Sequence, residues 1–303
     1  MEEMQRKVPL EAVLLYSDYA HGEISRRDFL DGINKIAVGS VAAAAMIEAL
    51  MPKYAEGQQV ARNDDRIKAS YETVPSPQGN GSIKGYFVRP VSADTREATV
   101  AKLPGIIVVH ENRGLNPHIE DIARRLALAN FMAFAPDGLT SLGGFPGDDY
   151  KGGQLFNKVD KAKMFEDMVA SALWLKNRAD STGKIGITGF CYGGSVSNLM
   201  AVRLGADLGA AVPYYGGPPP DADIPKIKAA VLAQNGALDK RLAEGWPAYD
   251  KALTAAGVTH EGYVYENCVH GFNCDATPER YNEEAAKLAW SRTIAWFNKH
   301  VRG

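Results

Sequence analysis

The sequence is short of cysteine, carries almost no net charge and has no hydrophobic run long enough to span a bilayer comfortably. Only three cysteines occur among 303 residues, so they cannot all pair, and none has the Cys-x-x-Cys spacing of a zinc site. The net charge of −2 gives no reason to expect nucleic acid or an anionic membrane as a partner. Internal repeats, a phosphate-binding loop and low-complexity tracts are absent too. What remains is typical of a soluble globular protein, 46% hydrophobic and 23% charged.

Two of the three cysteines, Cys268 and Cys274, flank His270. A short-loop disulfide between them is one alternative, but a disulfide needs a specific geometry that sequence spacing does not establish. We therefore expect two buried or half-exposed thiols, and we predict no metal site.

One glycine-rich turn surrounds the third cysteine, Gly189-Phe190-Cys191-Tyr192-Gly193-Gly194. It follows an apolar run, Lys184–Thr188, that is typical of a strand, and it precedes a helix-like stretch, Ser195–Leu204. Strand, tight glycine turn and helix in that order are the context of a nucleophile elbow. Such a turn lifts the Cys191 thiol above the sheet, where the N–H groups of the helix N-terminus favour the reactive thiolate. The alternative is a buried structural cysteine, which the hexapeptide alone does not exclude.

Two further polar residues follow the elbow in the order that this arrangement requires, an acid first and a histidine last. Asp239 ends a turn after the apolar run Ala229–Gln234, and His270 follows the strand-like run Gly262–Tyr265. Both lie just past the C-terminal ends of expected strands, the edge at which open α/β sheets bind ligands. Singly, an aspartate in a turn is usually a turn former. Together and in this order, the two residues predict catalytic partners for Cys191.

With these residues the sequence resembles the dienelactone hydrolase family of α/β-hydrolases. The elbow and the His270-Gly271-Phe272 turn are the specific part of the match, and the intervening helices are generic. The matching stretches, within roughly residues 70–303, are Gly105–Asn116, Ala135–Gly147, Ile185–Gly194, Val231–Asp239, Tyr265–Asp275 and Tyr281–His300. The resemblance implies the α/β-hydrolase fold, a Cys-His-Asp triad, and hydrolysis of a small-molecule carboxylic ester or lactone. It implies no metal or organic cofactor.

The mechanism implied by the resemblance begins with attack of Cys191 on the carbonyl carbon. His270 moves the proton, Asp239 fixes the imidazole tautomer, and a thioester acyl-enzyme forms and is hydrolysed. The backbone N–H of Tyr192, directly after the nucleophile, is the first expected oxyanion donor. The N–H of Asn112, in the loop after the preceding strand, is the expected second donor.

Glu111 lies in the same loop, within His110-Glu111-Asn112-Arg113-Gly114. In the family a glutamate follows this strand and interacts with the nucleophilic cysteine, controlling its protonation before substrate binds. The match predicts that role for Glu111, and the alternative is an ordinary exposed loop carboxylate.

The resemblance is incomplete in the substrate site. Dienelactone hydrolases proper recognise a substrate carboxylate with arginines, one of them shortly after the histidine, and here Gly271–Asp275 contains none. This departure puts the dienelactone specificity in doubt and leaves the triad intact. Arg113 is a candidate anchor for an anionic group, because guanidinium fits carboxylate well. Four aromatic residues are candidate pocket walls or ordinary packing: Phe145, Tyr150, Tyr215 and Phe272.

Residues 1–63 differ from the rest, so we predict an N-terminal extension to a hydrolase domain of residues 64–303. The extension contains Ser25-Arg26-Arg27-Asp28-Phe29-Leu30, which resembles a twin-arginine export signal. The alanine-rich stretch that follows, Ile36–Met51, contains Glu48 and is too short to span a bilayer comfortably. The acidic preceding segment and the lack of a clear cleavage site favour helices packed on the enzyme. Periplasmic export and a cytoplasmic location with the extension retained therefore both stay open.

The remainder of the chain alternates strands with helices, which predicts a doubly wound, mostly parallel sheet. An antiparallel hairpin of Ile67–Val74 and Ser82–Val88 is expected at the sheet edge. Gly105–His110 is expected to be a central strand buried on both faces. Other strands are expected at Phe131–Ala135 and Ala210–Tyr215, and helices at Asn116–Ala129, Lys161–Arg178, Trp246–Gly257 and Glu279–His300.

Two other functions stay open. One is a hydrolase of the same fold that acts on another ester, a thioester or another bond. The other is a non-catalytic binding protein that retains the fold, although a fold alone does not need the three triad residues together.

Overall fold

The computed structural model describes residues 7–91 and 102–302. The strands are β1 (Ile67–Ser76), β2 (Gly81–Pro90), β3 (Leu103–Val109), β4 (Met132–Pro136), β5 (Ser181–Phe190), β6 (Ala210–Tyr214), β7 (Ala230–Gly236) and β8 (His260–Tyr265). The α-helices are α1 (Leu10–His21), α2 (Arg26–Ile36), α3 (Ser40–Leu50), α4 (Pro117–Leu128), α5 (Asp149–Phe156), α6 (Lys161–Lys176), α7 (Tyr192–Leu204), α8 (Lys240–Ala255) and α9 (Glu283–Phe297).

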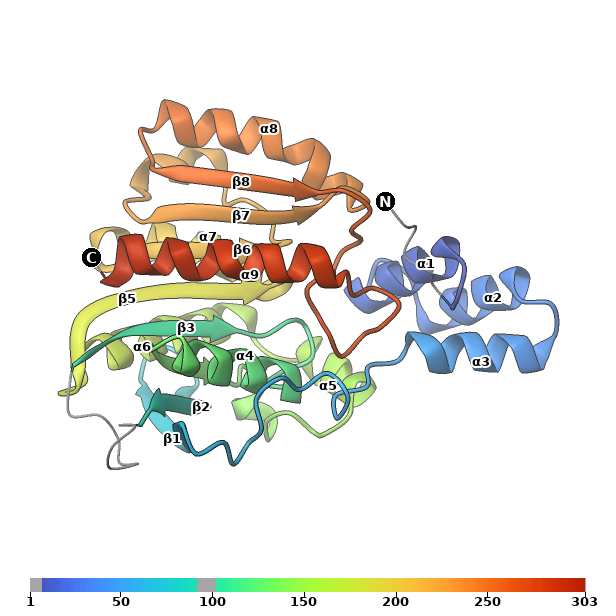
Figure 1. The fold of residues 1–303 in the computed structure, drawn as a ribbon, viewed down its shortest axis with the longest axis horizontal. Coiled ribbons are helices and arrows are strands. Elements are labelled where there is room, and N and C mark those ends of the chain that lie inside the picture. The colour runs from blue at the N-terminus through green and yellow to red at the C-terminus, as the bar shows by residue number, and fades with distance from the viewer. Residues whose placement is uncertain (1–6, 92–101, 303) are drawn as a thin grey trace.

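The strands form one eight-stranded sheet in the order β1-β2-β4-β3-β5-β6-β7-β8 (Figure 1). β1 and β2 are an antiparallel hairpin at one edge, and β2 also pairs antiparallel with β4. The other pairs, from β4 and β3 through to β7 and β8, are all parallel. The predicted mostly parallel sheet and its edge hairpin are therefore confirmed, and the carboxyl ends of the parallel strands meet at one edge.

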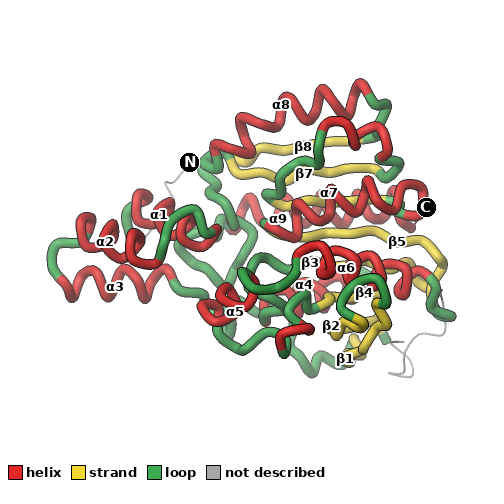
Figure 2. The backbone as a smooth tube through the Cα atoms, turned by 180° about the vertical axis from the view of Figure 1, so that it is seen from behind, coloured by secondary structure: helices red, strands yellow, loops and turns green. Residues whose placement is uncertain are grey.

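Helices cover both faces of this sheet (Figures 1 and 2). One core cluster joins α4 and α9 to the sheet through side chains such as Ile119 and Phe297. The other joins α6, α7 and α8 to it through Met168, Met200 and Leu253. Because both faces are covered, every residue of β3 is buried, as the continuous apolar run predicted.

Helix α8 begins earlier than the sequence pattern predicted. The prediction placed its start at Trp246, whereas the helix begins at Lys240, directly after Asp239. Gly245 and Pro247 interrupt the apolar periodicity in the first turns, although the helix continues through both. The early start matters for the site, because it places Asp239 at the helix N-cap position.

The N-terminal region folds into α1, α2 and α3, which share a small hydrophobic core of their own. The twin-arginine-like motif forms the start of α2, where Ser25 and Asp28 make a capping box. Phe29 is 2% exposed and Ile33 is fully buried, so this helix is folded onto its neighbours. Figure 1 shows the three helices beyond the end of the sheet to which the arrowheads of β7 and β8 point. In the parts of the chain that the structure describes, no helix is both long and apolar enough to cross a membrane.

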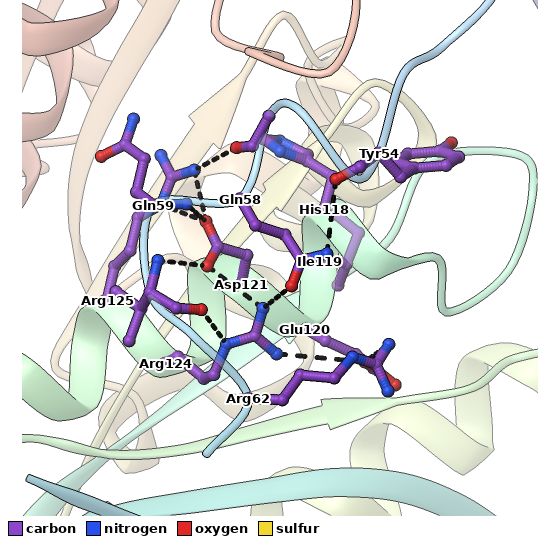
Figure 3. Close-up of polar contacts among 12 residues, drawn as sticks. Tyr54, Gln58, Gln59, Arg62, His118, Ile119, Glu120, Asp121, Arg124 and Arg125 are labelled. Atoms are coloured by element: carbon purple, nitrogen blue, oxygen red, sulfur yellow. Dashed lines mark hydrogen bonds and ion pairs between the residues drawn. The ribbon is translucent and has the colours of Figure 1, made fainter. Parts of the chain in front are cut away.

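Hydrogen bonds and ion pairs of a buried polar cluster join the segment between α3 and β1 to α4 (Figure 3). The Asp121 carboxylate accepts hydrogen bonds from the backbone N–H groups of Gln59 (3.1 Å) and Val60 (2.9 Å). Arg124, fully buried, donates from Nε to the carbonyl of Val60 at 2.8 Å and pairs with Asp121. These bonds satisfy the buried backbone groups of a segment that has no regular secondary structure of its own.

Candidate active site

Cys191 lies at the turn between β5 and α7 in the backbone conformation of a nucleophile elbow. Its φ is 55° and its ψ is −112°, a combination that L-residues rarely adopt. The close approach of the first turn of α7 to β3 and β5 explains the glycines. A Cβ on Gly193 would lie 2.2 Å from the carbonyl oxygen of Val109 in β3, and one on Gly189 would lie 2.1 Å from that of Gly193. The turn thus places the thiol directly before the first N–H groups of α7, which favour negative charge.

Asp239 and His270 meet at the same edge of the sheet. Asp239 follows β7 and is the N-cap residue of α8, and His270 lies in the loop after β8. The distance from His270 Nδ1 to Asp239 Oδ2 is 2.5 Å, and both side chains are less than a tenth exposed. A hydrogen bond at Nδ1 fixes the tautomer and the orientation of the ring, so that proton exchange by the ring takes place at Nε2.

The charge state of His270 depends on both partners. Burial lowers the pKa of His270, but the negative charge of the Cys191 thiolate, hydrogen bonds with Asp239 and Cys191, and the Asp239 carboxylate together raise that pKa to about 9. The charged form of the His270 ring is therefore favoured at neutral pH.

A cavity of about 640 Å³ opens over these three side chains. Tyr192, Asn112 and Tyr215 also line it. Tyr192 is the first residue of α7, so its N–H is one of the helix-terminal donors beside Cys191. The side-chain amide of Asn112 donates to the carbonyl of Ala20 at 2.6 Å, which holds the loop after β3 in place.

A smaller cavity beside Cys191 is lined by four charged residues, two acidic (Glu111 and Asp149) and two basic (Arg113 and Arg280). Glu111 lines it, as does Arg280, for which the sequence made no prediction. Arg280 is 6% exposed, and within the described residues its Nε has no hydrogen-bond partner. Burial opposes its charge, but Tyr16, Glu111, Cys274 and Tyr215 more than offset this and raise the pKa of Arg280 above its usual value.

The five candidate substrate-binding residues are distributed over several environments. Tyr215 lines the main cavity, with its ring centroid 4.7 Å from that of His270, and Phe272 packs behind it, fully buried. Arg113 turns toward α1 and donates to the carbonyl of Ala20 at 2.8 Å. Phe145 and Tyr150 each line a different cavity, neither of which includes Cys191.

The hydroxyl of Tyr215 has no hydrogen-bond partner within the described part of the chain, although it is buried. Burial, together with the nearby charge of Glu111, raises the pKa of Tyr215 well above its usual value, so the phenol keeps its proton. It is therefore a hydrogen-bond donor close to the reacting groups.

A second histidine, His118, lies near a second thiol. His118 Nδ1 is 3.1 Å from the Asp275 carboxylate, and the adjacent Cys274 lines the smaller cavity. Burial lowers the pKa of His118, but the charge of Cys274 and the hydrogen bonds to Asp275 and Cys274 raise it to about 10. Cys268 and Cys274 are both buried thiols, the arrangement expected from the sequence.

The described residues contain no group of three histidine, cysteine or acidic side chains arranged to hold a metal ion.

Comparison with known proteins finds that this chain is similar to hydrolases. The family model described as "Dienelactone hydrolase family" matches residues 83–301. A protein named "Putative carboxymethylenebutenolidase" from Escherichia coli O157:H7 is 33% identical over 252 residues, which cover 78% of this chain and 89% of the relative. The "Putative hydrolase fragment YghX" of E. coli K12 is 50% identical over 118 residues, which are 39% of this chain and 96% of the relative.

A solved structure agrees with these sequence matches. The "Putative Dienelactone Hydrolase" from Klebsiella pneumoniae superimposes with a TM-score of 0.67 at 32% identity, covering 77% of this chain and 99% of that chain. The family match begins inside β2, so α1, α2 and α3 lie outside it.

Proposed function

This chain belongs to the dienelactone hydrolase family, and on that premise we propose that Cys191, His270 and Asp239 perform its chemistry. Membership makes the protein a carboxylic ester or lactone hydrolase with a small-molecule substrate. The observation that carries the residue assignment is the convergence of these three side chains at one cavity, with the thiol at a strained elbow. A structural cysteine would not need a conformation that costs about 1–3 kcal/mol.

The reaction has two halves. The Cys191 thiolate attacks the carbonyl carbon, the tetrahedral intermediate collapses, and the alkoxide leaves with the proton held on Nε2 of His270. The thioester that forms is then attacked by water, which gives its proton to the same nitrogen. Collapse of the second intermediate releases the carboxylic acid and restores the thiolate and the imidazolium. Asp239 holds the ring in the tautomer that both halves require.

The negative oxygen of each intermediate needs preorganised donors. We assign the backbone N–H groups of Tyr192 and Asn112, because one begins α7 beside the nucleophile and the other lies in the loop after β3 that lines the cavity. Loss of one such donor typically lowers the rate about a hundred- to a thousandfold.

Glu111 is assigned to control of the Cys191 thiol. Its carboxylate and Cys191 line one small cavity, together with the buried guanidinium of Arg280. A carboxylate close to the thiol disfavours the thiolate until a substrate displaces it or neutralises its charge.

Arg280 supplies the buried positive charge that the loop directly after His270 lacks. Its guanidinium has hydrogen-bonding capacity to spare beside Cys191, and guanidinium binds carboxylate with matched geometry. This favours an ester or lactone that carries a carboxylate, the substrate type that the name carboxymethylenebutenolidase describes in the relative.

Trapping of the acyl-enzyme tests the nucleophile. With a p-nitrophenyl ester, the wild-type protein should gain the mass of the acyl group on the peptide that contains Cys191, and Cys191→Ala should neither gain it nor turn over. Cys268→Ala is the matched control, because that thiol is fully buried and does not line the main cavity. Full activity of the Cys191→Ala variant would refute the assignment.

The export signal stays a prediction. The motif Ser25–Leu30 retains its resemblance to a twin-arginine signal while forming the capped start of α2. Cell fractionation with N-terminal sequencing of the purified protein tests it, because an intact Met1 in the cytoplasm contradicts export.

A further inference from the structure

Helix α1 is part of the wall of the catalytic cavity. We propose that this helix determines which esters reach Cys191: Leu14 limits their size, and Asp18 and Glu23 disfavour substrates that carry negative charge on that side. The proposal rests on the proposed function, since it takes the cavity over Cys191 as the place where the substrate reacts.

The lining of the cavity is the first observation. Leu14, Ser17, Asp18 and Glu23, all from α1 or the turn after it, face the same space as Cys191. Leu14 is 37% exposed, a large apolar side chain that no core encloses. An apolar side chain on the wall of this cavity is suited to contact the apolar part of a ligand.

The second observation is that α1 is bonded to the loop that carries the proposed oxyanion donor. The carbonyl of Ala20 accepts hydrogen bonds from Asn112 Nδ2 at 2.6 Å and from Arg113 Nη2 at 2.8 Å. At the other end of the helix, the backbone N–H groups of Lys7 and Val8 donate to the Glu279 carboxylate. These bonds hold the helix against the hydrolase domain at both ends.

Apolar packing joins the same elements. The core that α1, α2 and α3 share also contains Val269, which is fully buried, and Leu238 packs against it. These two residues directly precede His270 and Asp239. The ring of Tyr16 on α1 lies 5.2 Å from the Arg280 guanidinium, a cation–π contact beside the smaller cavity. The extension therefore packs against the loops that present the proposed catalytic groups.

This wall lies outside the part of the chain that matches the family. The family match starts at residue 83, and the Klebsiella pneumoniae structure is covered to 99% by 77% of this chain. Whatever selectivity α1 provides is therefore an addition to the shared hydrolase domain.

The charged side chains that line the cavity determine which substrates are disfavoured. Asp18 and Glu23 lie on the α1 side of the cavity, whereas Lys240 and Arg241 lie on the side of α8. Burial, and after it the charge of the neighbouring Glu23, raises the pKa of Asp18. A substrate carboxylate on the α1 side meets two like charges, so an anionic ester binds there less well than a neutral one.

The experiment compares a matched pair of acetyl esters, 4-acetoxybenzoate and its neutral methyl ester, by chromatographic detection of the released phenols. The double variant Asp18→Asn/Glu23→Gln should raise kcat/KM for the anionic ester relative to the neutral one on the order of fivefold, as expected for like charges roughly 8 Å apart. The gain should shrink in 0.5 M salt. Glu11→Gln is the control, because Glu11 is an exposed carboxylate on α1 that does not line the cavity.

A second variant tests the size limit. Leu14→Ala should extend the chain length of p-nitrophenyl esters that are hydrolysed well, and Leu14→Trp should shorten it, with p-nitrophenyl acetate as the internal reference. If neither the charge ratio nor the chain-length profile changes in enzymes that remain active, α1 is not a specificity wall and the proposal is overturned. That outcome leaves the catalytic assignment standing, because Cys191→Ala is judged by turnover of any ester.

Discussion

Replacement of Asp239 by asparagine isolates the contribution of the buried carboxylate to the reaction. The substitution keeps the size of the side chain and removes its charge at a 2.5 Å contact with His270 Nδ1. The asparagine amide can also donate to Nδ1, which would stabilise the wrong tautomer. We therefore expect a large loss of kcat with little change in fold.

The size of the expected loss in rate follows from the pKa of His270. Burial alone would lower it, yet Cys191 and Asp239 raise it from 6.5 to about 9, which corresponds to roughly 3 kcal/mol in favour of the charged imidazole. The charge of Cys191 is the largest of the raising causes, so Asp239 supplies only part of that stabilisation. Loss of roughly half of it lowers the rate about tenfold, and a trapped wrong tautomer extends the loss toward the roughly 10⁴-fold seen for the equivalent change in a serine protease triad. We expect kcat/KM to fall between these limits.

The assay is hydrolysis of p-nitrophenyl acetate from pH 5 to 10, with circular dichroism to verify the fold. Without the carboxylate, the pKa of His270 falls toward its usual value, so the imidazolium should lose its proton at lower pH than in the wild-type protein. Asp250→Asn is the matched control, because Asp250 lies on the same helix, α8, and contacts His260 Nε2 at 3.1 Å. Its side chain is half exposed, so its loss should change the rate less than about twofold.

The reasoning is refuted if the Asp239→Asn variant keeps more than a tenth of the wild-type activity with an unchanged pH profile. Equal losses in the Asp239→Asn and Asp250→Asn variants would also refute it, because a general effect on α8 would then explain both.

Four other substitutions make three separate predictions. Glu111→Gln should lower kcat and change the rate of Cys191 alkylation by iodoacetamide while the melting temperature stays high, and unchanged values of both would contradict its role. Gly193→Ala should lower the free energy of unfolding, because the new Cβ at the elbow would lie 2.2 Å from a carbonyl oxygen of β3. Gly245→Ala is the control, because a Cβ there meets nothing within 4 Å. This second variant should raise the free energy of unfolding in urea by up to about 1 kcal/mol. The pKa of His118 is raised to about 10 in the folded state, so its stabilising effect is complete below pH 6.5 and is lost as the pH rises through about 10. His118→Gln should therefore flatten the fall in unfolding free energy over that window, and an unchanged slope would contradict the shift.

The order of strands, turns and helices around the site could be predicted because each of them is specified by residues that are close together in the chain. The glycines at positions 189 and 193, the apolar runs that lead into Asp239 and His270, and the Asn116-Pro117 helix start are all sequence signals of short range. Position just past a strand end is enough to assign a residue to the carboxyl edge of a parallel sheet.

The contributions of Arg280 and Leu14 could not be predicted in this way. Arg280 lies in a loop with no periodic pattern, and its burial depends partly on Tyr16, which is more than 260 residues away in the chain. Leu14 belongs to an apolar face of a helix, and the sequence pattern of such a face is the same whether the face packs in a core or lines a cavity. Phe145, expected near the substrate, lies in another cavity because its backbone N–H is held by Asp137 at 2.7 Å. The path of that loop depends on a tertiary contact.

The sequence by itself determined a mostly parallel sheet and the positions of Cys191, Asp239 and His270 just past the ends of strands, because strand, turn and cap preferences act between near neighbours. Only the tertiary structure decided which side chains share the cavity with Cys191. Packing of α1 against the loops after β3, β7 and β8 sets the distances and the burial there, and these contacts join residues far apart in the chain. Charge state, cavity shape and selectivity follow from those distances, so they become visible only in the folded molecule.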